Sequence, residues 1–169
     1  METLVHYGQK VNQLYEAYQR RDINTIINTL SRDCIWEVMG QPDIPFAGIY
    51  HGQDDIRQFF NKLDDCLDMN DFVLEHILEN GNLVIATGHF NAAAKKTGRR
   101  CTTLWSMTYE FDNQEKIVHF RDCYDTLAVA KAVSDTIGQK SDTGGQRSQG
   151  SGQRSEGDQR SQRGGRSDV

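Results

Sequence analysis

Residues 33–60 constrain the fold more than any other part of the chain. Both prolines, Pro42 and Pro45, fall inside this stretch. Proline removes a backbone donor and fixes φ, so neither a helix nor a central strand runs through it. We therefore expect a strand over residues 34–39, an open loop, and a helix over residues 53–67. The loop carries large apolar side chains, which predicts that it folds over an apolar cavity; they are Ile44, Phe46 and Ile49.

The rest of the chain divides into helical segments before this stretch and strands after it. One apolar stripe predicts a helix over residues 3–20, and Asp22 is a suitable N-cap for a second helix. Asn80 and Gly81 form a strong hairpin signal. Three helices followed by an antiparallel meander predict an α+β domain. The later strands are expected at residues 72–78, 83–93, 99–111 and 117–126, with a short helix at 127–137.

Composition changes sharply near Gly138. Residues 138–169 hold no aromatic side chain and one aliphatic one, Val169. Such a segment buries too little apolar surface to offset its chain entropy. We therefore expect a domain over residues 1–137 and a disordered tail over 138–169. The tail has a net charge of +2 and the rest −7, and an acidic body argues against nucleic-acid binding.

Sequence motifs for cofactors, metals or covalent nucleophiles are absent. The chain lacks the G-x-S-x-G, H-E-x-x-H, Walker A and G-x-G-x-x-G patterns, and its histidines form no local cluster. Its first ten residues lack an apolar signal-peptide core, and no apolar run reaches membrane-spanning length. We expect a cytoplasmic protein with no cofactor, no metal and no membrane contact. Its four cysteines, which have no C-x-x-C spacing, are expected to be reduced, with a disulfide or zinc site as the alternative.

Alternation along each strand divides its side chains between two faces, one of which points inward. The expected inward residues, strand by strand, are Trp36 and Val38, then His89 and Asn91, then Trp105 and Met107, and last Asp122 and Tyr124. The apolar members are typical of any core. The polar members are informative, because a buried polar group needs either a hydrogen-bond partner or a functional role.

Asp122 has two open interpretations. A buried carboxylate is costly unless it is paired or hydrogen-bonded, so Asp122 could be a structural group bonded to a His, a Tyr or a backbone N–H. It could instead be an acid/base group whose pKa rises through desolvation. His89 in the same cavity would favour the second interpretation.

Three segments together resemble a known superfamily. They are YEAYQRRDINTIINTLSRDCIWEV, the stretch at 33–60, and EKIVHFRDCYDT. They resemble the SnoaL-like branch of the nuclear transport factor 2-like superfamily, which includes ketosteroid isomerases, polyketide cyclases and limonene epoxide hydrolases. The resemblance covers about residues 4–133. It implies a cone-shaped, curved antiparallel sheet wrapped around three N-terminal helices, with a ligand pocket at its mouth. It also implies a homodimer that pairs through the outer sheet face, which carries Leu104, Ser106, Thr108, His119 and Arg121.

The resemblance does not extend to two of the catalytic residue sets of this superfamily. Val38 stands where ketosteroid isomerases carry their base, and Met107 where they carry a protonated Asp. His89 and Asn91 replace the Arg-x-Asp pair of the limonene epoxide hydrolases. SnoaL-type cyclases need one acid/base Asp in an apolar pocket, and Asp122 is on the strand where it is expected.

The sequence therefore favours a protein that binds a small apolar or aromatic molecule. If it is an enzyme, it is a cyclase, isomerase or lyase that transfers a proton through Asp122, with His89 as its partner. The alternative is a non-catalytic ligand-binding or association module whose cone is filled by its own side chains. The expected ligand contacts are Trp36, Val38, Phe46, Phe59, Asn91, Trp105, Met107 and Tyr124.

Overall fold

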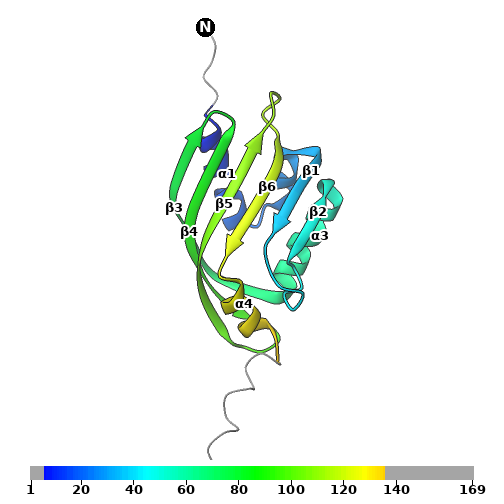
Figure 1. Ribbon diagram of the computed structural model, residues 1–169, viewed down its shortest axis with the longest axis vertical. Helices are drawn as coiled ribbons and strands as arrows, with labels where there is room; N and C mark the ends of the chain where they lie inside the picture. Colours follow the sequence, from blue (N-terminus) through cyan, green and yellow to red (C-terminus); the bar gives the residue numbers. More distant parts are fainter. Residues whose placement is uncertain (1–5, 136–169) are drawn as a thin grey trace, which may run out of the picture.

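The computed structural model of the chain describes residues 6–135, in which helices precede and flank a single sheet (Figure 1). The expected tail at 138–169 and its boundary after residue 137 lie outside the described residues. The elements in chain order are α1 (Tyr7–Gln19), α2 (Ile23–Thr29), β1 (Leu30–Val38), β2 (Gly48–His51), α3 (Gly52–Cys66), β3 (Leu67–Asn80), β4 (Leu83–Ala94), β5 (Arg100–Phe111), β6 (Ile117–Tyr124) and α4 (Thr126–Val133).

The α+β architecture is confirmed, and the sheet is curved and unclosed (Figure 1). Its strand order is β2-β1-β6-β5-β4-β3. One pairing corrects the expectation of a wholly antiparallel sheet, because β1 runs parallel to β6. No hairpin joins these two strands: β1 enters the sheet directly from α2, whereas β6 arrives at the end of the β3–β6 meander. The short strand β2, which lies within the expected loop, pairs with the other side of β1.

The helices cover the sheet with their apolar sides. Asp22 caps α2 by accepting a hydrogen bond from the Thr25 amide at 3.1 Å, as its position predicts. In Figure 1, α1 lies behind the sheet, α3 flanks β1 and β2, and α4 lies beyond the ends of the central strands. The buried residues of α1 and α3 are Val11, Leu14, Tyr15, Ala17, Ile56, Phe59 and Phe60. They close a core between the helices and the concave face of the sheet.

Strand β4 turns the face opposite to the one expected toward this core. Its buried residues are Val84, Ala86, Phe90, Ala92 and Ala94. The expected inward positions of His89 and Asn91 are therefore wrong. The pairing with β5 explains this, since residues opposite one another on neighbouring strands share a face. Gly88 lies opposite Trp105, and a Cβ at Gly88 would lie 2.5 Å from a ring carbon of Trp105. The indole ring thus packs directly over the glycine backbone.

The other structural findings concern cysteines, membranes and metals. Cys34, Cys66, Cys101 and Cys123 are all free thiols. Within residues 6–135, no helix combines the length and apolar character needed to cross a membrane. The same part of the chain contains no group of three or more His, Cys, Asp or Glu side chains placed to hold a metal ion.

Candidate functional site

An apolar cavity of about 80 Å³ lies between the concave face of the sheet and helices α1 and α3. Its wall is formed mainly by aromatic rings from these helices and from the strands. Several residues expected to contact a ligand meet in this wall, namely Trp36, Phe46, Phe59, Met107, Asp122 and Tyr124. Residues from five separate parts of the sequence are thus brought together around one small space.

Phe46 reaches the cavity from the proline-containing loop. Its side chain is 3% exposed. Its ring centroid lies 6.4 Å from that of Tyr124 and 6.5 Å from that of Phe59. The loop backbone is held in place by the Tyr50 hydroxyl, which donates a 2.9 Å hydrogen bond to the Phe46 carbonyl oxygen. The loop therefore closes one side of the cavity with an aromatic ring.

Four of the expected site residues lie elsewhere. Val38 and Trp105 are buried in the core but do not line the cavity. On the outer sheet face, the His89 ring Nδ1 lies 2.6 Å from a carboxylate oxygen of Glu75. Asn91 is on the same face as His89. His89 is therefore not placed to orient Asp122 or to contact a ligand in the cavity.

Asp122 is the acidic group of the cavity. It projects from β6 and is buried. Within the described residues its Oδ1 atom has no hydrogen-bond partner. Desolvation raises the pKa of its carboxyl to about 7, because burial disfavours the charged form. A purely structural carboxylate would be expected to have partners for both of its oxygens.

Tyr15 and Tyr109 form a buried hydroxyl pair in the same cavity wall. Their hydroxyl oxygens lie 2.9 Å apart, and Tyr15 also lies 3.1 Å from the Met107 sulfur. Burial raises the pKa of both phenols far above the usual range, so both remain protonated donors at neutral pH. Tyr109 lies on the same face of β5 as Met107, and Tyr15 is one of the buried residues of α1. Sequence patterns did not predict that the two hydroxyls would meet.

Two further buried polar atoms lie on residues of the wall. The Trp36 indole Nε1 and the Tyr124 hydroxyl have no hydrogen-bond partner among the described residues. Such groups are costly to leave unsatisfied. Together with Asp122, they provide donors and an acid/base group in an otherwise apolar space, which suits a ligand that carries an oxygen.

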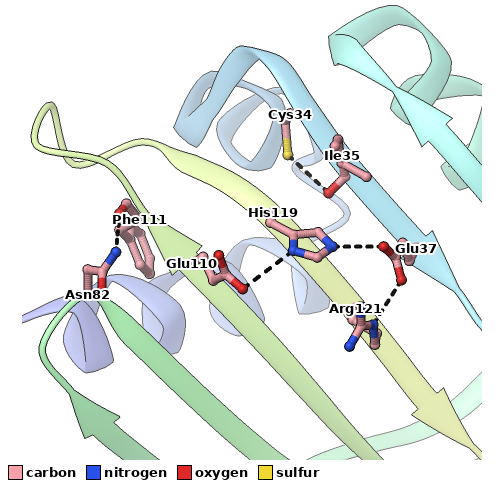
Figure 2. A network of polar contacts seen from close by, with 8 residues as sticks. All are labelled: Cys34, Ile35, Glu37, Asn82, Glu110, Phe111, His119 and Arg121. Carbon is pink, nitrogen blue, oxygen red and sulfur yellow. Dashed lines mark hydrogen bonds and ion pairs between the residues drawn. The ribbon is translucent and has the colours of Figure 1, made fainter.

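The outer sheet face carries a separate polar network (Figure 2), and none of its charged residues lines the cavity. One Glu37 carboxylate oxygen lies 2.9 Å from the His119 Nε2, and the other accepts a 2.8 Å hydrogen bond from Arg121. The hydrogen bonds from Arg121 and His119 hold the pKa of the Glu37 carboxyl below its usual value. Glu110 lies 3.4 Å from the Nδ1 atom of His119. This network joins β1, β6 and β5 across their outer surface.

Comparison with known proteins identifies the fold family. The SnoaL-like domain family matches residues 11–120. No curated protein sequence matches the chain. An NTF2-like protein from Burkholderia thailandensis E264 is 28% identical, with a TM-score of 0.70 over 78% of this chain and 99% of that chain.

Two more distant structures share the fold. TerC, co-crystallised with polyporic acid, is 16% identical, with a TM-score of 0.65 over 76% of this chain and 98% of that chain. An LEH-like epoxide hydrolase from M. tuberculosis is also 16% identical, with a TM-score of 0.58 over 75% of this chain and 88% of that chain. Likeness at this level of identity concerns the fold alone, because one fold serves many chemistries.

Proposed function

The chain belongs to the SnoaL-like domain family, and we propose that its cavity binds a small, neutral, apolar or aromatic molecule and that Asp122 transfers a proton on it. One observation carries the proposal. The Asp122 carboxyl is buried among aromatic rings, its Oδ1 atom has no partner among the described residues, and its pKa is about 7. At neutral pH such a group exists in both protonation states, so it can take up a proton and return it.

The reaction class follows from the groups that share the cavity. The Asp122 carboxylate removes a proton from a carbon next to a carbonyl, and the electron pair of that C–H bond moves to the carbonyl oxygen. One hydroxyl of the Tyr15–Tyr109 pair donates to the other, and the remaining O–H supplies a hydrogen bond to this developing negative charge, which is most effective where water is excluded. Return of the proton to another carbon completes an isomerisation. Attack of the carbanion on a second carbonyl carbon would instead close a ring, and the proton held by Asp122 would pass to the alkoxide oxygen that this attack forms.

The charge of the wall favours a neutral ligand. Among the described residues, no Lys, Arg or His side chain lines the cavity, and Asp122 is its one carboxylic acid. An anionic ligand would be desolvated there without a counter-charge, at a cost of several kcal/mol. TerC, which shares this fold, was co-crystallised with polyporic acid, an organic small molecule.

Hydrogen–deuterium exchange on a simple ketone tests proton transfer directly. The probe is 2-indanone, a small neutral aromatic ketone with acidic α-hydrogens, whose exchange in D2O is followed by NMR. The wild-type protein should accelerate exchange. Asp122→Asn should lose this acceleration while still binding the ketone.

His89→Gln is the matched control, because His89 lies on the outer sheet face. It should exchange 2-indanone as fast as the wild type. Equal rates for the wild type and Asp122→Asn would defeat the proton-transfer role of Asp122.

A second function is favoured by the size of the cavity. Its 80 Å³ is small beside ligand pockets of about 300–1,000 Å³. A cone filled by its own side chains fits a non-catalytic association module. In that case no small aromatic ketone or phenol should raise the melting temperature, whereas the proposed ligand-binding function requires a rise.

A further inference from the structure

A larger, polar hollow adjoins the cavity. This hollow, here called the vestibule, has a volume of about 550 Å³ and lies where the C-terminal parts of α1 and α3 meet the start of β3. Vestibule and cavity share the residues Tyr18, Phe60, Leu63, Leu67, Met69 and Phe72. The acidic end of the cavity is formed by Tyr109, Asp122 and Tyr124. None of these three residues lines the vestibule. The two spaces therefore meet at side chains other than those around Asp122.

Side chains alone narrow the junction between the two spaces. The Tyr18 ring lies edge-on to Phe72 at 5.2 Å between centroids and is tilted against Phe60 at 6.4 Å. Phe72 is stacked on the buried Trp105 ring at 5.0 Å, whereas Tyr18 lies edge-on at the junction and is partly exposed. Exposed side chains change rotamers rapidly, so rotation of Tyr18 would widen the junction without any movement of the sheet.

The outer wall of the vestibule is polar, unlike that of the cavity. Gln19, Asn61 and Asn70 contribute amide groups, each of which both donates and accepts hydrogen bonds. Arg21 is already paired with Asp64, with 3.1 Å between its guanidinium and the carboxylate. The vestibule thus offers many neutral hydrogen-bonding groups and few unpaired charges.

We propose that the vestibule is a second subsite of the same ligand and holds a neutral, hydroxylated substituent of the ring that occupies the cavity. This inference rests on the proposed function, because it needs the cavity to accept the ring. The cavity is too small to enclose more than one small ring, while the vestibule has several times its volume and the side-chain amides that the cavity lacks. The ligand class is therefore a neutral amphipathic molecule with an aromatic head and a hydroxylated tail.

The charges of the vestibule disfavour an anionic tail. Arg21, the one cation among the described residues that line the vestibule, is paired with Asp64, which also lies 3.8 Å from Lys95. Asp71 lines the vestibule too, but its carboxylate accepts a 3.2 Å hydrogen bond from the Asn91 side chain on the outer sheet face. A carboxylate on the ligand would therefore find no unpaired cation among these lining residues, whereas a hydroxyl needs none.

Three para-substituted phenols separate the contributions of head and tail. 4-Ethylphenol supplies the head with an apolar tail, 2-(4-hydroxyphenyl)ethanol adds a neutral hydroxyl, and 4-hydroxyphenylacetate adds a negative charge. Dissociation constants are measured by calorimetry on the full chain. NMR signals of the Trp36 indole N–H and the Asn61 side-chain amide report occupancy of the cavity and of the vestibule.

The hydroxylated phenol should bind about 5-fold more tightly than 4-ethylphenol, as one added hydrogen bond allows, and the anion should bind most weakly. All three should shift the Trp36 signal, and only the hydroxylated phenol should shift the Asn61 amide strongly. Asn61→Leu should remove the 5-fold preference and leave binding of 4-ethylphenol unchanged. Gln58→Leu is the matched control, since Gln58 is exposed on the same helix but does not line the vestibule, and it should keep the preference.

The possible results distinguish failure of the vestibule subsite from failure of the function proposed for the cavity. Equal affinity of 4-ethylphenol and the hydroxylated phenol would overturn the vestibule subsite and leave the cavity function standing. Tightest binding of the anion would overturn the assignment of a neutral tail. Failure of all three phenols to bind or to shift the Trp36 signal at millimolar concentration would overturn the proposed function, and the vestibule subsite with it.

Discussion

The hydroxyl oxygens of Tyr15 and Tyr109 lie 2.9 Å apart in the buried core and join helix α1 to strand β5. Both side chains line the cavity that contains Asp122. The pair thus supplies a fixed donor beside a carboxyl group in an apolar space. Neither a helix stripe nor a strand pattern alone specifies such a meeting, because it depends on how α1 crosses the sheet.

Tyr15→Phe should slow proton exchange and slightly destabilise the protein. The change removes one buried hydrogen bond, which contributes about 1 kcal/mol to folding, and it removes a donor to the developing oxyanion. Urea unfolding and 2-indanone exchange measure the two effects. Tyr7→Phe is the control, because the Tyr7 hydroxyl makes only a long 3.4 Å bond outside the cavity. Equal exchange rates for Tyr15→Phe and the wild type would show that this hydroxyl does not assist the reaction.

Asp122→Asn should change how stability depends on pH. In the unfolded chain Asp122 loses its proton near pH 3.8, and in the folded protein only near pH 7. As pH rises from about 4 to about 7, the unfolded state is favoured, so the folded protein loses stability. The loss is roughly 4 kcal/mol at about 1.4 kcal/mol per pH unit.

The asparagine variant lacks this titration, so it should gain stability relative to the wild type across the same pH range. Urea unfolding at pH 4, 5.5 and 8 measures the difference between the two proteins. A difference that stays constant with pH would contradict the raised pKa.

Gly88→Ala should destabilise the protein severely. An added Cβ would lie 1.9 Å from the Val73 carbonyl oxygen and 2.5 Å from the Trp105 ring. Overpacking against backbone and a buried ring should cost about 3 kcal/mol or more. Gly81→Ala is the control. It has a φ of 61° and no atom within 4 Å of the added Cβ, so it should cost only about 1 kcal/mol. Similar losses for the two variants in thermal unfolding would show that Trp105 does not require Gly88.

The sequence predicted the elements and much of the cavity wall, since these depend on local patterns. In the proline loop, in α3 and in β5, the order of apolar and polar residues predicts which side of the segment faces inward. The face of β4 was predicted wrongly, although alternation favours the observed one: its inward side chains Val84, Ala86, Phe90, Ala92 and Ala94 are all apolar, whereas the expected face carries His89 and Asn91. The register with β5 decides the face, and register depends on the exact turn geometry.

Small residues explain which face of β4 turns toward the core. Ala86 lies opposite Met107, and Gly88 lies opposite Trp105. Met107 and Trp105 thus leave room only for small residues directly opposite them on β4. A search for such large-to-small complementarity between neighbouring strands would have placed His89 outside. No local sequence pattern predicts the vestibule, because α1, α3 and β3 form it only after the chain has folded.

Homodimer formation through the outer sheet face stays a prediction. Leu104 is 73% exposed on this face, and Ile49 is 63% exposed on β2. Exposed apolar side chains beside a polar network are typical of an interface. Light scattering at micromolar protein should give twice the 19.2 kDa mass of the chain. Leu104→Lys should give the monomer mass, and a monomeric wild type would contradict the prediction.

The pKa of Asp122 is the most direct test of the account. The titration of its carboxyl carbon is measured by NMR on 13C-labelled protein, and the signal is assigned by its absence in Asp122→Asn. We expect a midpoint near pH 7, caused by desolvation of the carboxyl in the aromatic cavity. A midpoint near pH 4 would mean that water or a partner stabilises the carboxylate, and it would contradict the role of Asp122 as a proton-transfer group.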